Sequence, residues 1–256
     1  MSWGRRLRRV VLPLLLLAAL IGAWQIAAAN GAIADALSIE PFLIPSPAEV
    51  GQALWENRGL LWENTWVTLR EILVGLGCGI LAGVLLALPM RFSSLLRDTF
   101  FPLAVAAQSM PIVAIGPILL VWFGFGIWPK VILVALAVFF PILVTTLDGL
   151  RSVDPEAVKM MRTLDASRWA IFRRVEVPTA VPSFFSGLKV AAAIAPIVAL
   201  FAELVGSSSG LMHQIQTDNA NFETARVFAA AVILMVIGVL LFALATLAER
   251  LLVRWR

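Results

Sequence analysis

Cysteine, histidine and phosphate-binding glycine motifs are scarce or missing in this sequence, and each scarcity excludes a class of protein. Cys78 is the only cysteine and lies in an apolar stretch, so one chain can form neither a disulfide framework nor a cysteine-based metal site. His213 is the only histidine, which excludes sites that need several imidazoles, and we interpret it as a polar loop residue. No G-x-x-x-x-G-K-[ST] loop occurs, which excludes ATP hydrolysis by that route.

Charge is also scarce, at 14% of the 256 residues, whereas 61% are hydrophobic and the mean hydropathy is +0.93. A water-soluble core cannot absorb that much apolar surface, but the hydrocarbon of a membrane can. A net charge of +4 and a pI near 10.2 by themselves suggest a nucleic-acid partner. The basic residues lie at the ends of apolar segments, however, as membrane insertion produces, so no nucleic acid is expected.

Several apolar segments are long enough to cross a membrane, since a span needs about 20 mostly apolar residues. We predict an all-α polytopic membrane protein of about six transmembrane helices, forming one domain over residues 1–256. The expected spans are residues 10–29, 68–90, 100–123, 129–147, 184–204 and 227–252. The first follows a basic start, as a signal peptide does, but its apolar run is longer than the usual signal core, which favours a retained helix.

The distribution of Lys and Arg predicts that both termini lie in the cytoplasm. Residues 30–67 form a polar connection that is rich in acids and has Arg58 as its one basic residue, so we expect it outside. The basic residues assigned to the inner side are Arg91, Arg97, Arg151, Lys159, Arg162, Arg168, Arg173, Arg174, Arg250, Arg254 and Arg256. Those assigned to the outer side are Arg58, Arg70, Lys130 and Arg226.

Glycine and proline are frequent within the spans. The second span contains Gly75, Gly77, Gly79 and Gly83, and the third contains Pro102, Pro111 and Pro117. The glycines favour close helix packing over a pathway role. The prolines bend a helix and free backbone carbonyls, which is tolerated only beside protein or a water-filled cavity. The third span is therefore a candidate for lining a route, with Gln108 and Pro111 as candidate pathway residues.

The inner loop of residues 149–183 has helical signals of its own. Asp154, Pro155 and Glu156 predict a helix start, with Asp as the N-cap and Pro at the first position. The apolar residues that follow at helical spacing are Ala157, Met160, Met161 and Leu164. A second short helix is expected over residues 166–175, ended by Pro178 and Pro182. It would present Trp169 and Phe172 beside Arg168, Arg173 and Arg174.

An amphipathic basic surface of this kind has two explanations. It either lies on anionic lipid headgroups or docks into a groove of another protein. Aromatic and Met anchors surrounded by Arg favour docking.

Four stretches of the sequence resemble the permeases of type I ATP-binding-cassette (ABC) importers, especially the sulfonate, taurine and nitrate branch. They are FLIPSPAEV at 42–50, WFGFGIWPKV at 122–131, RTLDASRWAIFRRVEVP at 162–178 and AELVGSSSGL at 202–211. The family's cytoplasmic loop reads E-A-A-x(3)-G-x(9)-I-x-L-P. The residues at those positions here are Lys159, Met160, Met161, Asp165, Val175, Val177 and Pro178. The spacing matches throughout, although Asp165 stands where the family has glycine. Because Asp tolerates positive φ better than most residues, we predict that the turn persists and that Asp165 caps the second helix.

The resemblance implies a permease subunit, not an enzyme, without catalytic residues, a metal or a cofactor of its own. It implies a cytoplasmic ATPase that binds ATP and Mg, an extracytoplasmic solute-binding protein and a second permease copy in the cell membrane. The loop would contact the ATPase, and ATP-driven closure would rock the helices between two states. The expected coupling residues are Lys159, Met160, Met161, Arg162, Leu164, Asp165, Ala166, Ser167, Arg168, Trp169, Phe172 and Pro178.

Glu203 lies near the outer end of the fifth span, where a carboxylate is costly unless it faces protein or water. It either belongs to an external gate, together with Ser207 and Ser208, or is hydrogen-bonded to neighbouring helices or to the turn at residues 206–210. The other ionisable residues near span ends, Arg70, Glu71 and Lys189, are expected to reach the interface. Residues 42–47 have two X-Pro steps, which favour extended chain, and form either a landing element for the binding protein or a plain connector.

Two other classes remain as alternatives, and the cargo stays open. The first is a secondary transporter, which usually shows paired broken helices in inverted repeats. The second is a membrane enzyme, which needs convergent catalytic groups in its spans. We find neither pattern in the sequence. Permeases of the resembled kind carry sulfonates, taurine, nitrate, pyrimidine vitamin precursors or riboflavin. The relaxed E-A-A motif and the stretch PSFFSGLKVAA at 182–192 favour the pyrimidine and riboflavin group.

Overall fold

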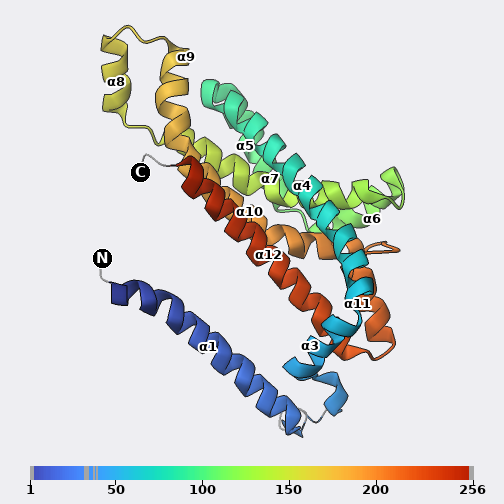
Figure 1. Ribbon diagram of the computed structural model, residues 1–256. Coiled ribbons are helices and arrows are strands. Elements are labelled where there is room, and N and C mark those ends of the chain that lie inside the picture. The colour runs from blue at the N-terminus through green and yellow to red at the C-terminus, as the bar shows by residue number, and fades with distance from the viewer. Residues whose placement is uncertain (1–2, 32–34, 37, 39, 254–256) are drawn as a thin grey trace. The chain divides into compact units, whose positions relative to one another are not determined.

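Helices make up all the regular structure in the described part of the chain (Figure 1). The structure is a computed structural model that describes residues 3–31, 35, 36, 38 and 40–253. Within them, five helices are long and apolar enough to cross a membrane: Val11–Ala29, Arg58–Phe92, Ile127–Arg151, Arg168–Leu204 and Thr224–Leu252. The all-α membrane fold is thus confirmed. Arg254 and Arg256, which the sequence assigned to the inner side, lie outside the described residues.

The chain divides into two compact units, of which the first comprises Met1–Asn64 and Gln214–Ile233. It contains α1 (Trp3–Ala29), the short 3-10 helix η1 (Pro41–Leu43) and α3 (Pro47–Glu56). The Gln25 side chain accepts a hydrogen bond from the Ala48 N–H (3.0 Å), which connects α1 to the start of α3. Part of the polar connection of residues 30–67 is therefore helical. Ser46 and Glu49 form a reciprocal capping box, and this local signal starts a helix there.

The second unit comprises Thr65–His213 and Leu234–Arg256. Its centre is α7 (Ile127–Arg151), which packs along α10 (Val177–Leu204) and contributes many of the buried apolar side chains. The other long helices of this unit are parts of α4 (Arg58–Phe92) and α12 (Thr224–Leu252). Short α11 (Leu211–Ala220) begins in this unit and contains His213, which is therefore in a helix and not in a loop.

Glycines allow α4 to pack directly against α7. An added Cβ at Gly79 would lie 2.2 Å from Val138 Cγ2, and one at Gly75 or Gly83 would also come closer than 3.0 Å to α7 side chains. These glycines recur every four residues and therefore lie on one face of the helix. Gly77 is on another face, where an added Cβ would meet nothing within 4 Å. Close packing, expected for all four glycines, is thus confirmed for three.

This packing gives a first prediction, that Gly79→Ala destabilises the protein by about 1–3 kcal/mol because the new methyl group overpacks the contact with Val138. Thermal unfolding of the purified chain in detergent measures the loss. Gly77→Ala is the matched control, and since nothing crowds that site we expect no loss there. Equal unfolding temperatures for the two variants would contradict the role of this contact.

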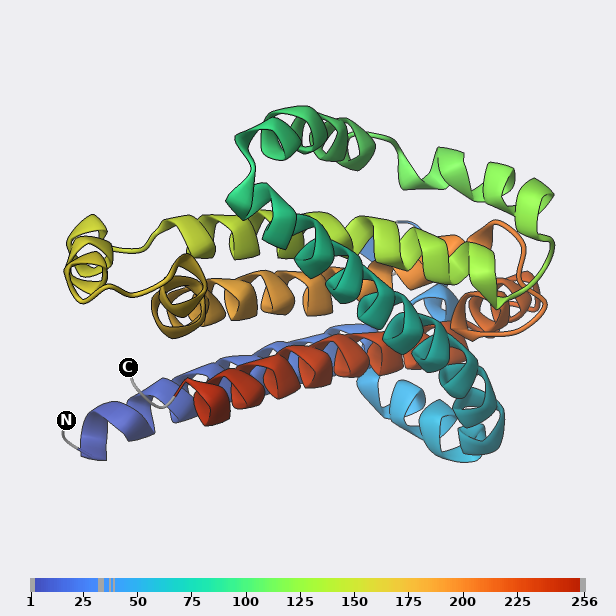
Figure 2. The same ribbon diagram turned by 90° about the horizontal axis from the view of Figure 1, so that it is seen from above.

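The segment expected as a single third span, residues 100–123, is two helices. α5 (Ser94–Gln108) ends before a break at residues 109–111, and α6 (Ile112–Phe123) follows. Figure 2 shows the two in succession along one side of α7. The prediction of one continuous span is wrong because Pro111 has no N–H for a helical hydrogen bond and takes an extended backbone (ψ 114°).

The helix after the inner loop continues instead of ending at Pro178 and Pro182. α9 (Arg168–Ile171) passes through a π-helical turn, η2 (Phe172–Glu176), directly into α10. In this wider turn the Val177 N–H donates to the Phe172 carbonyl, five residues back. Pro178 then occupies the first turn of α10, where a missing N–H is tolerated. The expected helix end is therefore wrong, because the π turn accommodates the proline.

Candidate functional site

The segment of residues 154–176, hereafter the α8–α9 segment, lies at one end of α7 and α10 (Figure 1). α8 (Pro155–Thr163) begins as the sequence predicted, since the Asp154 carboxylate accepts from the Glu156 N–H (2.8 Å) and Pro155 occupies the first position. The local sequence alone defines this helix start, because a cap needs no partner from elsewhere in the fold.

A tight turn separates α8 from α9, as predicted. Asp165 has a positive φ of 53°, so it takes the backbone conformation that favours glycine. The predicted cap is wrong, however, because the N-cap of α9 is Ser167, whose hydroxyl accepts from the Ala170 N–H (3.2 Å). Ser167 has the extended backbone that an N-cap requires, and Asp165 lies two residues too early.

Large apolar side chains of this segment are exposed to solvent. Met160, Leu164 and Trp169 are 66%, 68% and 64% exposed, and α8 buries none of its residues. An exposed apolar group on a polar, basic segment is typical of a surface that meets a partner. Of the other expected coupling residues, those exposed are Lys159, Arg162, Asp165, Ser167 and Arg168, and those partly buried are Met161, Ala166 and Pro178.

Phe172 is buried, so the expectation that it is presented on the surface is wrong. Its ring stacks on Trp169 (5.3 Å between centroids) and also contacts Phe92 at the end of α4 (5.0 Å). Trp169 thus stacks on Phe172, and Phe172 in turn packs on Phe92. Phe92 comes from the end of a helix that is distant in the sequence, which is why the pattern of the α8–α9 segment alone did not reveal this contact.

An ion pair strengthens the same junction. Arg91 donates from Nε and Nη2 to the two carboxylate oxygens of Glu176, at 3.0 and 2.6 Å. Such two-point contacts fix geometry as well as charge. From sequence, Arg91 bears only on membrane orientation and Glu176 has no evident role, because opposite charges 85 residues apart give no local signal.

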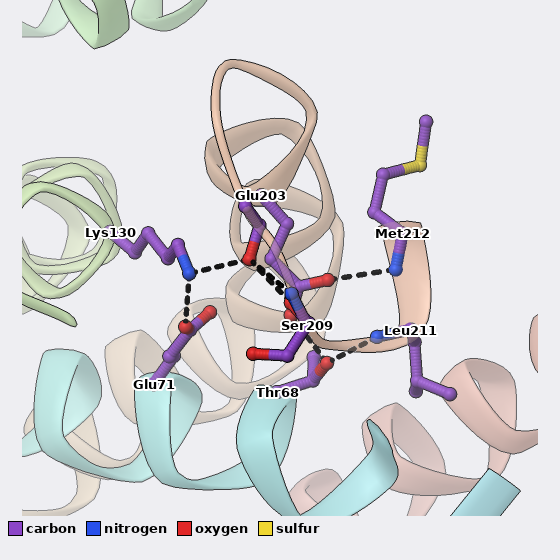
Figure 3. Close-up of polar contacts among 8 residues, drawn as sticks. Thr68, Glu71, Lys130, Glu203, Ser209, Leu211 and Met212 are labelled. Carbon is purple, nitrogen blue, oxygen red and sulfur yellow. Dashed lines mark hydrogen bonds and ion pairs between the residues drawn. The ribbon is translucent and has the colours of Figure 1, made fainter. Parts of the chain in front are cut away.

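The second candidate site is a buried polar cluster, shown in Figure 3. We define the polar cluster as Thr68, Glu71, Lys130, Glu203 and Ser207. Lys130 donates to Glu71 Oε1 (2.9 Å) and to the Ser207 hydroxyl (2.7 Å), so it joins α4, α7 and the loop after α10. Glu71 and Glu203 are each 1% exposed and Lys130 is 7% exposed.

Glu203 fastens the loop of residues 205–210 to the neighbouring helices of the second unit. Its carboxylate accepts hydrogen bonds from the Thr68 hydroxyl and from the Met212 N–H (2.7 Å), while the Thr68 oxygen accepts from the Leu211 N–H (2.9 Å). Gly210 has a φ of 109°, and an added Cβ there would lie 2.5 Å from the carboxylate. These contacts are those of the structural alternative, in which Glu203 bonds to a neighbouring helix and to the following turn.

The structure brings only some of the candidate gate residues together. Ser207 bonds to Lys130, and Ser208 lines a cavity beside it. Gln108 and Pro111 belong to the α5–α6 break, where both are exposed, and are not part of the polar cluster.

One expectation about ionisable residues is wrong. Glu71 does not reach the interface but is buried against Lys130. Lys189 is partly exposed and pairs with Glu249 of α12. Arg70, by contrast, is exposed. Thr68, Glu71 and Lys130 were therefore missed as site residues. Thr68 and Glu71 are three apart, so they lie on one helix face, and two polar groups in an apolar span could have indicated that this face is buried.

The described residues contain no group of three or more His, Cys, Asp or Glu that could hold a metal ion. Cys78 is a free, exposed thiol.

The fold is that of a membrane subunit of an ABC transporter. A chain from a solved structure of the MetNI methionine ABC transporter, in inward-facing conformations, superposes with a TM-score of 0.64. The alignment covers 76% of this chain and 97% of that chain, at 18% sequence identity, so it supports the fold alone.

Residues 79–254 match the family described as binding-protein-dependent transport system inner membrane component. The chain belongs to this family: it is a multi-pass inner-membrane permease subunit of an ABC importer and not itself an ATPase. Membership implies an ATPase and a binding protein as partners.

Curated relatives cover nearly the whole chain. A probable ABC transporter permease of Haemophilus influenzae is 36% identical, over 91% of this chain and 93% of that protein. The formylaminopyrimidine transport permease ThiX of Halalkalibacterium halodurans is 35% identical, over 85% and 87%. The riboflavin transport permease RibX of Chloroflexus aurantiacus is 36% identical, over 84% and 81%. Permeases named for aliphatic sulfonates or taurine match at 27–30% identity.

Proposed function

We propose that this permease imports a small nitrogen heterocycle of the vitamin-precursor type, and that its α8–α9 segment docks on the ATPase. The observation that carries the docking proposal is the exposure of Met160, Leu164 and Trp169 on a segment that also carries exposed Arg162 and Arg168. We call these five residues the docking surface. Exposed aromatic, Met and Arg side chains are the anchors that protein interfaces use most.

The junction between the docking surface and the long helices can transmit a movement of the ATPase to the membrane-spanning part of the permease. Trp169 stacks on Phe172, Phe172 packs on Phe92, and Arg91 is paired with Glu176, so α4 and α10 are both attached to the base of α9. When the ATPase closes, a shift of α9 moves these two long helices together. Packed helices respond as rigid bodies with a small number of stable arrangements.

The α5–α6 break supports a pathway beside α7. Backbone groups freed at residues 109–111 need water or protein at membrane depth. Gln108 and Pro111 at this break would line a route that a second copy of the chain completes. The same arrangement allows a polar cargo to pass where a continuous apolar helix would exclude it.

The names of the relatives support the cargo class. ThiX and RibX are named for formylaminopyrimidine and riboflavin, both flat nitrogen heterocycles, and they match at 35–36% identity. The permeases named for sulfonates and taurine match less well, at 27–30%. The higher identity favours a heterocycle.

The orientation that goes with this function has the termini and the docking surface in the cytoplasm and the polar cluster at the outer end. Glu71 and Arg91 lie 20 residues apart on α4, and at about 1.5 Å per residue this separation is about 30 Å. That length equals the thickness of a bilayer core, about 30 Å. This match in length supports the proposal that the two sites lie near opposite faces of the membrane.

Cysteine labelling tests this orientation. In a Cys78→Ser background, Lys159→Cys should react with a membrane-impermeant maleimide only in inside-out vesicles, because α8 would face the cytoplasm. Gln52→Cys, exposed on α3, should react only from the outside of intact cells. Bound ATPase should slow labelling of Lys159→Cys several-fold. Labelling of Lys159→Cys in intact cells would reject the proposed orientation.

A further inference from the structure

A hollow of about 580 Å³ lies in the first unit, where the end of α1, the η1–α3 segment and the turn between α11 and α12 meet. Its lining includes two aromatic rings, Phe42 and Phe222, and two carboxylates, Glu49 and Glu223, and we call it the acidic hollow. The described residues that line it include no lysine or arginine. Such a site attracts a cation, because carboxylates and aromatic rings both favour positive charge.

Both aromatic rings of the acidic hollow are accessible. Phe42 is 50% exposed and Phe222 is 68% exposed, and the rings meet edge to face with their centroids 6.1 Å apart. The Thr224 hydroxyl donates a hydrogen bond to the Phe42 carbonyl, which ties η1 to the start of α12. The two rings are thus brought together by segments that are far apart in the sequence.

Phe222 occupies a backbone position that normally belongs to glycine. After α11 ends at Ala220, the Phe222 N–H donates to the Asn219 carbonyl (3.2 Å). The Glu223 N–H donates to the Asp218 carbonyl (2.8 Å). This is the Schellman pattern of a helix end, and Phe222 takes its left-handed position with a φ of 60°. Glycine would avoid the steric cost, so a strained Phe beside an open hollow indicates a function for its ring.

Both carboxylates of the acidic hollow are available to a partner. Glu49 is exposed, although its Oε2 accepts hydrogen bonds from Ser46 in the capping box. The Glu223 side chain is 54% exposed and lies 3.7 Å from Arg226. Arg226 makes a closer ion pair with Asp218 (3.0 Å), so it neutralises Glu223 only in part. The hollow therefore keeps its negative charge.

The sequence around the acidic hollow decides between possible occupants. Residues 30–64 carry five acids and one base, and residues 214–233 carry two acids and one base. This surface repels anionic lipid headgroups, and it repels the same acidic surface on a second copy of the chain. It attracts a partner protein that offers Lys or Arg side chains.

We propose that the acidic hollow is a docking site for the extracytoplasmic solute-binding protein, which places a Lys or Arg side chain against the two rings and within the field of the two carboxylates. The inference rests on the proposed orientation, in which α3 lies outside. The contact between the cation and the rings supplies affinity, and the acidic surroundings speed the encounter.

The first test uses the complete transporter with its ATPase in nanodiscs, and the probe is the purified binding protein that stimulates its ATP hydrolysis. Phe222→Gly removes the ring at a position that favours glycine, so the unfolding temperature should stay the same or rise while affinity for the probe falls about tenfold. Trp62→Ala is the matched control, since it removes an exposed ring of the first unit outside the hollow and should leave affinity unchanged. Unchanged affinity in Phe222→Gly, or a loss of stability, would mean that the ring serves packing and would reject the site.

A second variant tests the charge without touching the rings. Glu223→Gln keeps the size of the side chain, and affinity for the same probe should fall about threefold at low salt. The difference should shrink as salt is added, because salt screens exposed charges. Glu63→Gln, which removes an exposed carboxylate outside the hollow, is the control. Equal effects of the two variants would reject a specific contact at Glu223.

Photo-crosslinking identifies the occupant. Phe222→p-benzoylphenylalanine in intact cells should link to the binding protein near a Lys or Arg, and a link to lipid or to a second permease copy would overturn the proposal. If the variants bind the probe as the wild type does, the site is rejected and the import function stands. If Gln52→Cys reacts only in inside-out vesicles, the orientation is wrong and the site falls with it. Uptake of neither riboflavin nor a 4-aminopyrimidine would reject the cargo class and leave the docking site standing.

Discussion

Replacing Arg168 by Glu and Trp169 by Ala in one variant should abolish ATP-driven uptake while the chain still inserts into the membrane. Trp169 is a 64% exposed anchor supported by Phe172, and Arg168 supplies charge beside it. Loss of one interface anchor typically costs about 2 kcal/mol of association free energy, and 1.4 kcal/mol is a factor of ten. We therefore expect ATPase binding to weaken by more than about 30-fold. Co-purification of the ATPase with the tagged permease, followed by uptake in vesicles, measures both effects.

The chain offers a control with the same chemistry at another site. The Arg58 guanidinium lies over the Trp55 ring, 4.9 Å from its centroid, and Trp55 is exposed. Trp55→Ala with Arg58→Glu removes the same side chains from the proposed outer side, so ATPase co-purification should be retained. If the Arg168 and Trp169 variant keeps both its ATPase and its uptake, the docking surface is rejected, and the lipid-bound alternative for the α8–α9 segment becomes the better explanation.

Replacing Lys130 by Met should strongly destabilise the permease, by about 3–5 kcal/mol, because it leaves Glu71 as an unpaired carboxylate in a buried site. Ser207 loses its contact with Lys130 at the same time, so the loop of residues 205–210 is held less firmly. Thermal unfolding of the purified complex in detergent measures the loss. Uptake should fall with it.

A second substitution distinguishes charge from packing. In Lys130→Met with Glu71→Leu both charges are gone, so much of the lost stability should return. Arg97→Met is the surface comparison, since it breaks an ion pair with the well-exposed Asp98 and should change stability little. A double variant as unstable as Lys130→Met alone would show that the lysine acts through packing and not as the counter-ion of Glu71.

Patterns within a few turns of helix predicted much of this fold correctly. The apolar runs predicted the five long helices that are apolar enough to cross a membrane, and Asp154 with Pro155 predicted the start of α8, because caps and hydrophobic length depend on adjacent residues. The same reasoning failed at two prolines. A bent but continuous span was expected through Pro111, where the helix breaks, and a helix end was expected at Pro178, where the π turn at residues 172–176 lets the helix continue.

The polar cluster was only partly accessible from sequence. Glu203 stands out as a carboxylate in an apolar span, and that signal was recognised. The rest of the cluster was not, because Thr68 and Lys130 come from α4 and α7, which are distant from Glu203 in the sequence. Glu71 was assigned to the interface on the general rule that charged groups at span ends reach water. Glu71 is instead buried against Lys130, and no residue next to Glu71 in the sequence indicates this burial.

The sequence by itself determined the class of this protein, its long apolar helices and its family, since hydrophobic length, basic residues at span ends and the spacing from Lys159 to Pro178 are all properties of contiguous chain. Only the tertiary structure decided which polar groups meet. The pairs Arg91 with Glu176 and Lys130 with Glu71 join residues 85 and 59 positions apart. Whether such charges pair or face lipid depends on how α4, α7 and α10 pack. That packing is set by close contacts such as the one between Gly79 and Val138. Because Gly79 has no side chain, α4 can approach α7 closely at this point.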